Sequence, residues 1–177
     1  MKSNLILGLG NPLMGDDGVG WKVAELLAED SRLPPTAEVI CAGTDLLRWE
    51  DQMEGRAEVL LVDAILADGV VGSVEIFEDR FEELEDRQWN VHHLSPPQAI
   101  RLLQTAQPSL REVRFTLLAV SIESAEAGSG LSPVLHRRLP GIVDQVLRLL
   151  AAPSRLRPVT ALPGRGLENG ELLGPNQ

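Results

Sequence analysis

The sequence predicts a doubly wound α/β fold, in which helices cover both faces of a mostly parallel sheet. Segments with the apolar runs of strands alternate along the chain with segments of helical spacing. The apolar run within residues 58–65 is continuous, which indicates a strand buried on both of its faces. The length of 177 residues and the apolar fraction of 44% suit one domain with a full hydrophobic core.

The first half of the chain shows this alternation clearly. Residues 5–9 form a short apolar run that includes Gly8 and is followed by Gly10, which is typical of a buried strand. Apolar residues recur at helical spacing through 19–28, before Pro34 and Pro35 break the chain. Either Thr44 or Asp45 can cap a following helix. We therefore expect strands over 5–9, 38–42 and 58–65, and helices over 19–28 and 46–53.

The second half repeats the pattern with a longer final helix. Residues 70–77 alternate between apolar and polar, as a strand does, whereas the acidic segment 78–86 predicts a solvated helix or loop. Pro96 suits the first turn of a helix. We expect a helix over 96–105, a strand over 113–120, and a last helix from Ser132-Pro133 with apolar positions 135, 139, 142, 143, 146, 147, 149 and 150.

The composition changes after Ala152, where prolines and glycines interrupt any periodicity. We therefore expect a single α/β domain over 1–152 and a flexible tail over 153–177. Cys41 is the one cysteine, which excludes an internal disulfide and a cysteine-rich zinc site. It lies in an apolar run, so we expect a small buried side chain.

The charge and the apolar runs limit the possible partners. A formal net charge of −10 argues against nucleic-acid binding and indicates a solvated acidic surface. The N-terminus lacks the pattern of a signal peptide. No apolar run approaches the roughly 18 residues that span a bilayer. We therefore expect no membrane association and a cytoplasmic location.

The loop from Gly8 to Gly20 contains paired aspartates between glycines. A dinucleotide-binding fingerprint would need a glycine where Leu13 stands, and Pro12 lacks a backbone donor. Paired aspartates would also repel a pyrophosphate. We expect Asp16 to cap a helix or brace the loop and Asp17 to face a ligand, although the reverse assignment is open.

Two further positions carry ligand-type side chains. Asp63 ends an apolar run, where burying a carboxylate is costly unless it is paired, hydrogen-bonded or bound to a metal. The alternative to a role as a ligand is that Asp63 caps a helix or braces a loop. His92 and His93 precede an expected helix, whereas His136 is expected to be solvated. Ligands gather at the carboxyl ends of strands in such sheets. Two carboxylates and an imidazole there suit a divalent transition metal and leave open positions for water or substrate.

Nucleophilic catalysis has less support. Cys41 lies in an expected strand, and no serine stands in a Gly-x-Ser-x-Gly elbow.

These motifs resemble those of the nickel–iron hydrogenase maturation endopeptidases. The first loop is similar to the N-terminal signature of that family, Gly-x-Gly-Asn followed by paired acidic residues and a glycine. Val62-Asp63-Ala64 resembles the second acidic segment of the family, and Ala42-Gly43-Thr44 resembles its Gly-Gly-Thr turn. The segment 124–133 resembles the one before the final helix. The resemblance extends from about residue 5 to residue 150.

The resemblance implies a three-layer sandwich of the phosphorylase/hydrolase-like type, with a twisted sheet of five strands. It implies an endopeptidase that removes the C-terminal extension of a hydrogenase large-subunit precursor after nickel insertion. The nickel would be carried by the substrate, and zinc or cadmium could occupy the same site. The residues that map to metal-contacting and catalytic positions are Asp17, Asp63 and His93, with a supporting loop set of Gly10, Asn11, Asp16, Gly18, Gly43 and Thr44.

The histidine assignment has an alternative. Some family members carry Ser-Pro-His-Gln, and here Pro97 stands in the histidine position of Ser95-Pro96-Pro97-Gln98. Others place a histidine a few residues earlier, as His93 is here, and His92 is the other candidate.

The sequence leaves open both the mechanism of cleavage and two alternative functions. The metal could polarise the scissile carbonyl or activate a water, or a carboxylate could act as general base. A binding module with the same ligands would check the precursor for nickel without cleaving it. Gly8-Leu9-Gly10-Asn11-Pro12 also resembles the start of peptidyl-tRNA hydrolases, but Asp16-Asp17 stand where those enzymes carry a catalytic histidine.

Overall fold

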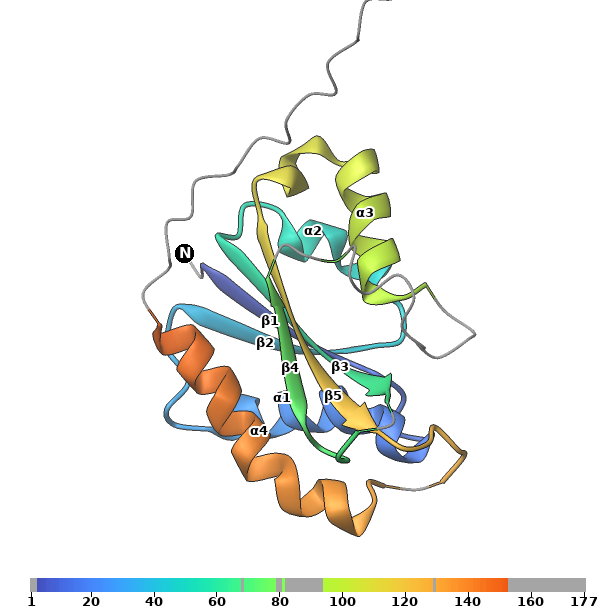
Figure 1. Ribbon diagram of the computed structural model, residues 1–177. Helices are drawn as coiled ribbons and strands as arrows, with labels where there is room; N and C mark the ends of the chain where they lie inside the picture. The colour runs from blue at the N-terminus through green and yellow to red at the C-terminus, as the bar shows by residue number, and fades with distance from the viewer. Residues whose placement is uncertain (1–2, 68, 79–80, 82–93, 129, 153–177) are drawn as a thin grey trace, which may run out of the picture.

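The computed structural model describes residues 3–67, 69–78, 81, 94–128 and 130–152. Within these residues the strands form one five-stranded sheet, which confirms the predicted fold class (Figure 1). The order along the sheet is β2-β1-β3-β5-β4, and only β4 runs antiparallel to its neighbour. The strands are β1 (Asn4–Leu9), β2 (Ala37–Gly43), β3 (Glu58–Leu66), β4 (Val74–Glu78) and β5 (Arg114–Ile122).

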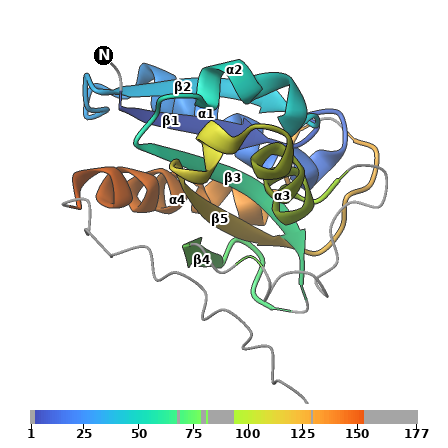
Figure 2. The same ribbon diagram turned by 90° about the horizontal axis from the view of Figure 1, so that it is seen from above.

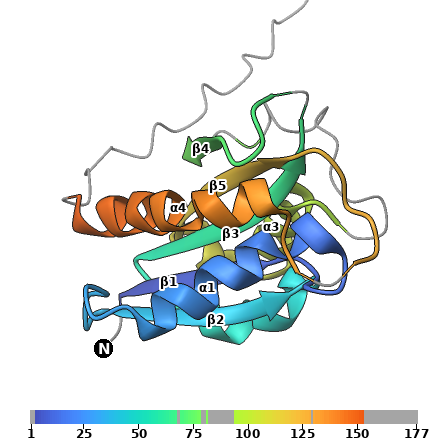
Figure 3. The ribbon, with the colours of Figure 1, turned by 90° about the horizontal axis from the view of Figure 1, so that it is seen from below.

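Helices cover both faces of the sheet, so the fold has three layers. The helices α2 and α3 lie on the face seen in Figure 2, and α1 and α4 lie on the face seen in Figure 3. The α-helices are α1 (Val19–Glu29), α2 (Glu50–Met53), α3 (Pro96–Ala106) and α4 (Pro133–Ala151). Short 3₁₀ helices cover Gly15–Gly18, Leu46–Trp49 and Pro108–Arg111.

Strand β3 lies in the middle of the sheet and separates two hydrophobic clusters. Leu61 and Ile65 pack into the cluster beneath α2 and α3. Leu60 and Val62 pack into the cluster beneath α1 and α4. The predicted burial of this strand on both faces is therefore confirmed.

The long amphipathic helix is also confirmed. Helix α4 buries five of the eight predicted apolar positions against the sheet, and the other three, Leu147, Leu149 and Leu150, are partly buried. The side chain of Ser132 caps it by accepting from the backbone N–H of Leu135 at 3.3 Å. Its buried residues are Leu135, Leu139, Ile142, Val143 and Val146.

Two expected elements differ in extent from the prediction. Residues 70–73 form a turn ahead of β4, because the N–H of Ser73 donates to the carbonyl of Val70 at 2.9 Å and Gly72 has φ of 78°. The helix expected over 46–53 is a 3₁₀ turn followed by the single turn α2. Asp45, one of the two expected caps, accepts from the N–H of Leu47 at 3.1 Å.

Cys41 is half-buried, whereas the sequence predicted a buried side chain. The reason is its position on β2, which forms an edge of the sheet. Partial burial raises the pKa of its thiol.

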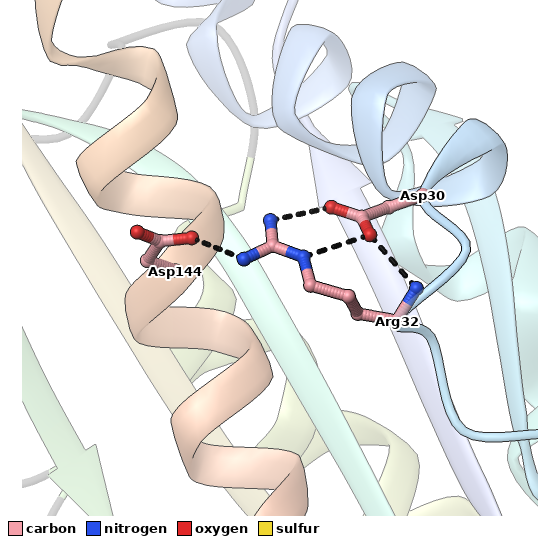
Figure 4. Close-up of polar contacts among 3 residues, drawn as sticks. All are labelled: Asp30, Arg32 and Asp144. Carbon is pink, nitrogen blue, oxygen red and sulfur yellow. Dashed lines mark hydrogen bonds and ion pairs between the residues drawn. The ribbon is translucent and has the colours of Figure 1, made fainter.

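An exposed ion-pair network ties the end of α1 to α4. Arg32 donates to both carboxylate oxygens of Asp30, and its Nη1 donates to Asp144 of α4 at 2.8 Å (Figure 4). Hydrogen bonds from Arg32 lower the pKa of Asp30 to about 2. Because the side chains of Arg32 and Asp144 are exposed, solvent screens the ion pair between them and its contribution to stability is small.

Several sequence predictions lie outside the described residues. These are the solvated segment 78–86 beyond Glu78 and Phe81, both histidines at 92 and 93, and the tail 153–177. None of the helices in the described part of the chain is long and apolar enough to cross a membrane.

Helix α1 packs directly on the ends of two strands, which makes a testable prediction. A Cβ at Gly20 would overlap the backbone carbonyl oxygens of Val62 and Leu9. We expect Gly20→Ala to lower the free energy of unfolding by about 3 kcal/mol, because backbone atoms would have to move. Urea unfolding monitored by circular dichroism measures this change.

The matched control is Gly141→Ala in α4. Gly141 is also helical, but a Cβ added there would meet no other atom of the described residues within 4 Å. Alanine should stabilise this helix by about 0.5–1 kcal/mol. Equal effects of the two substitutions would contradict the close packing at Gly20.

Candidate functional site

A pocket opens at the carboxyl ends of β1 and β3, where the sheet order changes direction. Strand β1 connects through α1 to β2 on one side, whereas β3 pairs with β5 on the other. Loops from adjacent strands diverge at such a switch point and leave a crevice. The empty space of the pocket is about 470 Å³, including the part open to solvent. Its lining residues are Leu9, Gly10, Asp17, Gly43, Thr44, Leu46, Asp63, Ala64, Leu94, Ser95 and Pro96.

The first loop folds back on itself and brings Asp17 to this pocket. Gly10 turns the chain after β1 with φ of 107°, and a Cβ there would overlap the backbone oxygen of Asp17. The N–H of Asn11 donates to Oδ2 of Asp17 at 2.9 Å. Asp17 is only 6% exposed, so this hydrogen bond partly compensates the loss of solvent around its carboxylate.

Asn11 stabilises the turn of the first loop and does not line the pocket. Its side-chain Oδ1 accepts from the N–H of Leu13 at 3.0 Å, and its carbonyl accepts from the N–H of Met14 at 2.9 Å. These bonds form an Asx turn that fixes the loop on either side of Pro12.

Asp16 points away from the pocket and braces the loop against α4. Its Oδ1 accepts from the N–H of Ser132 at 2.6 Å, although the two residues are 116 positions apart. The loop is held at the same place by a bridge between Met14 and Gly128. No side-chain hydrogen bond caps the 3₁₀ helix Gly15–Gly18 or α1, so Asp16 and Asp17 do not cap either helix.

Asp63 lies on β3 one residue beyond the end of the β1–β3 ladder, whose last pair is Gly8 with Val62. Its Oδ1 accepts from the N–H of Ala64 at 2.9 Å. Desolvation raises the pKa of Asp63 to about 8, the N–H of Ala64 opposes this shift, and the charge of Asp17 adds to it. The residue as a whole is half-buried, and it lines the pocket together with Asp17. The two carboxyl groups therefore lie close enough for the charge of one to act on the other.

Of the supporting residues predicted from the sequence, Gly10, Gly43 and Thr44 line the pocket. Gly10 also donates its N–H to the carbonyl of Gly43 at 3.0 Å, which joins the ends of β1 and β2. Asn11, Asp16 and Gly18 do not line it. In the part of the chain that the structure describes, no group of three or more histidine, cysteine or acidic side chains is arranged to hold a metal.

His92 and His93, the candidates for the third ligand, lie outside the described residues. Leu94, which follows His93 in the sequence, lines the pocket.

The start of α3 forms a wall that the sequence analysis did not assign to the site. Ser95 accepts from the N–H of Gln98 at 3.4 Å, and the side chain of Gln98 accepts from the N–H of Ser95 at 3.1 Å. This is a capping box. The pattern Ser-x-x-Gln is visible in the sequence and would have placed Ser95 at the start of the helix.

Comparisons with known proteins agree with this arrangement. Residues 21–149 match the family model described as hydrogenase maturation protease. The hydrogenase 2 maturation protease of Escherichia coli K12 is 27% identical over 148 residues, which cover 82% of this chain and 89% of that protein.

Solved structures of similar proteins share the fold. The NiFe hydrogenase maturation protease HybD from Thermococcus kodakarensis aligns with a TM-score of 0.70 and 28% identity over 82% of this chain and 97% of its own. The hydrogenase maturating endopeptidase HybD from E. coli aligns with a TM-score of 0.70 and 27% identity, covering 84% and 91%.

The raised pKa of Asp63 predicts a pH-dependent stability. The folded protein keeps this proton up to about pH 8, whereas the unfolded chain releases it near pH 4, so ionisation costs stability as the pH rises between these values. In the variant Asp63→Asn, the side-chain oxygen can still accept the hydrogen bond from the N–H of Ala64, but the side chain carries no charge. The stability of the wild type relative to Asp63→Asn should fall from about pH 5 to pH 8, by at most about 1.4 kcal/mol per pH unit.

Urea unfolding in a chelating buffer across this range measures the difference. Asp51→Asn, which removes an exposed carboxyl group from α2, supplies the baseline. A stability difference between wild type and Asp63→Asn that does not change with pH would show that the proton of Asp63 is not retained on folding.

The brace at Asp16 predicts a second effect on stability. Asp16→Ala leaves the N–H of Ser132 without its acceptor, so the free energy of unfolding should fall by about 1–3 kcal/mol. Asp16→Asn keeps an acceptor oxygen and should lose less. Equal losses in the two variants, measured by urea unfolding, would mean that the hydrogen bond contributes nothing.

Proposed function

Because the chain belongs to the family of hydrogenase maturation proteases, we propose that it is an endopeptidase that removes the C-terminal extension of a nickel–iron hydrogenase large-subunit precursor. The family match covers residues 21–149 and bears out the resemblance seen in the sequence motifs. The observation that carries the proposal is the convergence of Asp17 and Asp63 in one pocket.

The nickel of the precursor is the proposed ligand of this pocket. Asp17 follows β1 and Asp63 lies on the neighbouring strand β3. Desolvation is the main cause of the raised pKa of Asp63, and the charge of Asp17 adds to it. A divalent cation between them would offset that repulsion and favour the ionised form of both. His93 is the third ligand in this proposal, on the grounds of sequence, with His92 as the alternative.

A peptide held by its nickel would place the scissile bond beside these carboxylates. Three protein ligands would leave positions open on the metal for a water or a carbonyl oxygen. The metal would then polarise the carbonyl or activate the water. A carboxylate of the pocket could instead act as the general base.

Cleavage of the nickel-loaded precursor tests the proposal. We expect Asp17→Asn to lower the rate of cleavage by about 100-fold or more, because the negative charge is lost. The asparagine oxygen can still accept from Asn11, so the loop should keep its fold. Mass spectrometry of the precursor over time measures the rate, and Asp51→Asn is the control.

Wild-type activity in Asp17→Asn would remove Asp17 from the mechanism. A precursor whose mass never changes in the presence of the wild type, together with a stable complex, would indicate a nickel-checking chaperone instead. Repeating the assay with zinc- or cadmium-treated protein tests whether those ions occupy the same pocket and compete with the nickel of the precursor.

A further inference from the structure

A second pocket lies on the opposite side of the loop that carries Asp17. Its walls come from the first loop, from α1, and from the start of α4 with the residues before it. Its empty space is about 610 Å³, including the part open to solvent. Its lining includes Pro12, Gly18, Trp21, Leu131 and His136.

Only one turn of the chain separates the two pockets. Asp17 lines the first pocket and Gly18, its neighbour in sequence, lines the second. A Cβ at Gly18 would lie 2.7 Å from the Cα of Pro12, so the loop is closely packed at this point. Gly10 lines the first pocket and Pro12 lines the second, and two residues of chain span at most about 7 Å.

Trp21 adds a second connection between the two pockets. It lines the second pocket, and its ring atom Cζ3 lies 3.9 Å from the Cβ position of Gly43, which lines the first.

The chemistry of the second pocket suits an apolar side chain. Pro12, Trp21 and Leu131 supply apolar walls. The indole Nε1 of Trp21 donates to Glu25 at 3.0 Å, and Glu25 also accepts from Lys22 at 2.8 Å. Lys22, Glu25 and His136 also line the pocket, but the hydrogen bonds join Trp21, Lys22 and Glu25 to one another.

We propose that this second pocket is a subsite for the precursor polypeptide, and that it binds an apolar side chain close to the bond that is cleaved. The inference rests on the proposed function, because a protease must hold the chain on at least one side of the scissile bond. An extended polypeptide advances about 3.3 Å per residue. A chain that lies in the first pocket and passes over the exposed residue Pro12 therefore reaches the second pocket within a few residues.

Blocking the pocket from α4 is the sharpest test. His136 is exposed and lines the pocket, so His136→Trp fills the space without changing the first loop. We expect KM for the nickel-loaded precursor to rise about tenfold, with kcat unchanged, because the lost contact is one that holds the substrate in both ground and transition states. Arg137→Trp is the matched control, since it places the same ring on the neighbouring exposed position outside the pocket lining.

Trp21→Ala supplies an independent variant, because it removes an apolar wall instead of filling the space. It should also raise KM while kcat stays unchanged, and thermal unfolding reports whether each variant is folded. KM values within about twofold of the wild type for both His136→Trp and Trp21→Ala would overturn the subsite, as would an equal rise for Arg137→Trp. If His136→Trp does not fold, Trp21→Ala decides.

Failure of the proposed function gives a different result from failure of the subsite. In the first case the wild type does not cleave the precursor at all. In the second case the wild type cleaves it, Asp17→Asn lowers kcat, and the variants of the second pocket keep the wild-type KM.

Discussion

The close approach of helix α1 to the ends of β1 and β3 is the constraint on which the rest of the site depends. Gly20 leaves no room for a side chain, since a Cβ there would overlap the carbonyl oxygens of Leu9 and Val62. The turn that precedes the helix is therefore pressed onto the sheet edge. Because Asp17 belongs to that turn and Asp63 follows Val62, the same packing brings the two carboxylates to one pocket.

The two acidic residues of the first loop have different roles because they face different neighbours. Asp16 accepts from the N–H of Ser132 and ties the loop to the start of α4. Asp17 is 6% exposed and lies across the pocket from Asp63, whose pKa it helps to raise. Holding two carboxyl groups in a partly apolar pocket is unfavourable without a proton or a cation. In the proposed function, the divalent ion of the precursor would offset this electrostatic cost.

The same loop also forms the boundary between the two pockets. Its backbone is fixed from within by Asn11 and from outside by the bridge between Met14 and Gly128. The loop held at these positions presents Asp17 to the first pocket and Gly18 to the second.

Local patterns were sufficient to predict the order of strands and helices, the burial of β3 on both faces and the amphipathic stripe of α4, because each of these depends on residues close together in the chain. The family motifs likewise indicated Asp17 and Asp63 as candidate site residues.

Two local features were not predicted from the sequence. The turn at residues 70–73 depends on Gly72 adopting a positive φ. The half-burial of Cys41 depends on β2 lying at the edge of the sheet. The partner of Asp16, the wall formed by Ser95 and Pro96 and the second pocket were decided only by the tertiary structure. Each of these joins residues far apart in the chain, and no periodicity in a sequence records which distant segments will pack together.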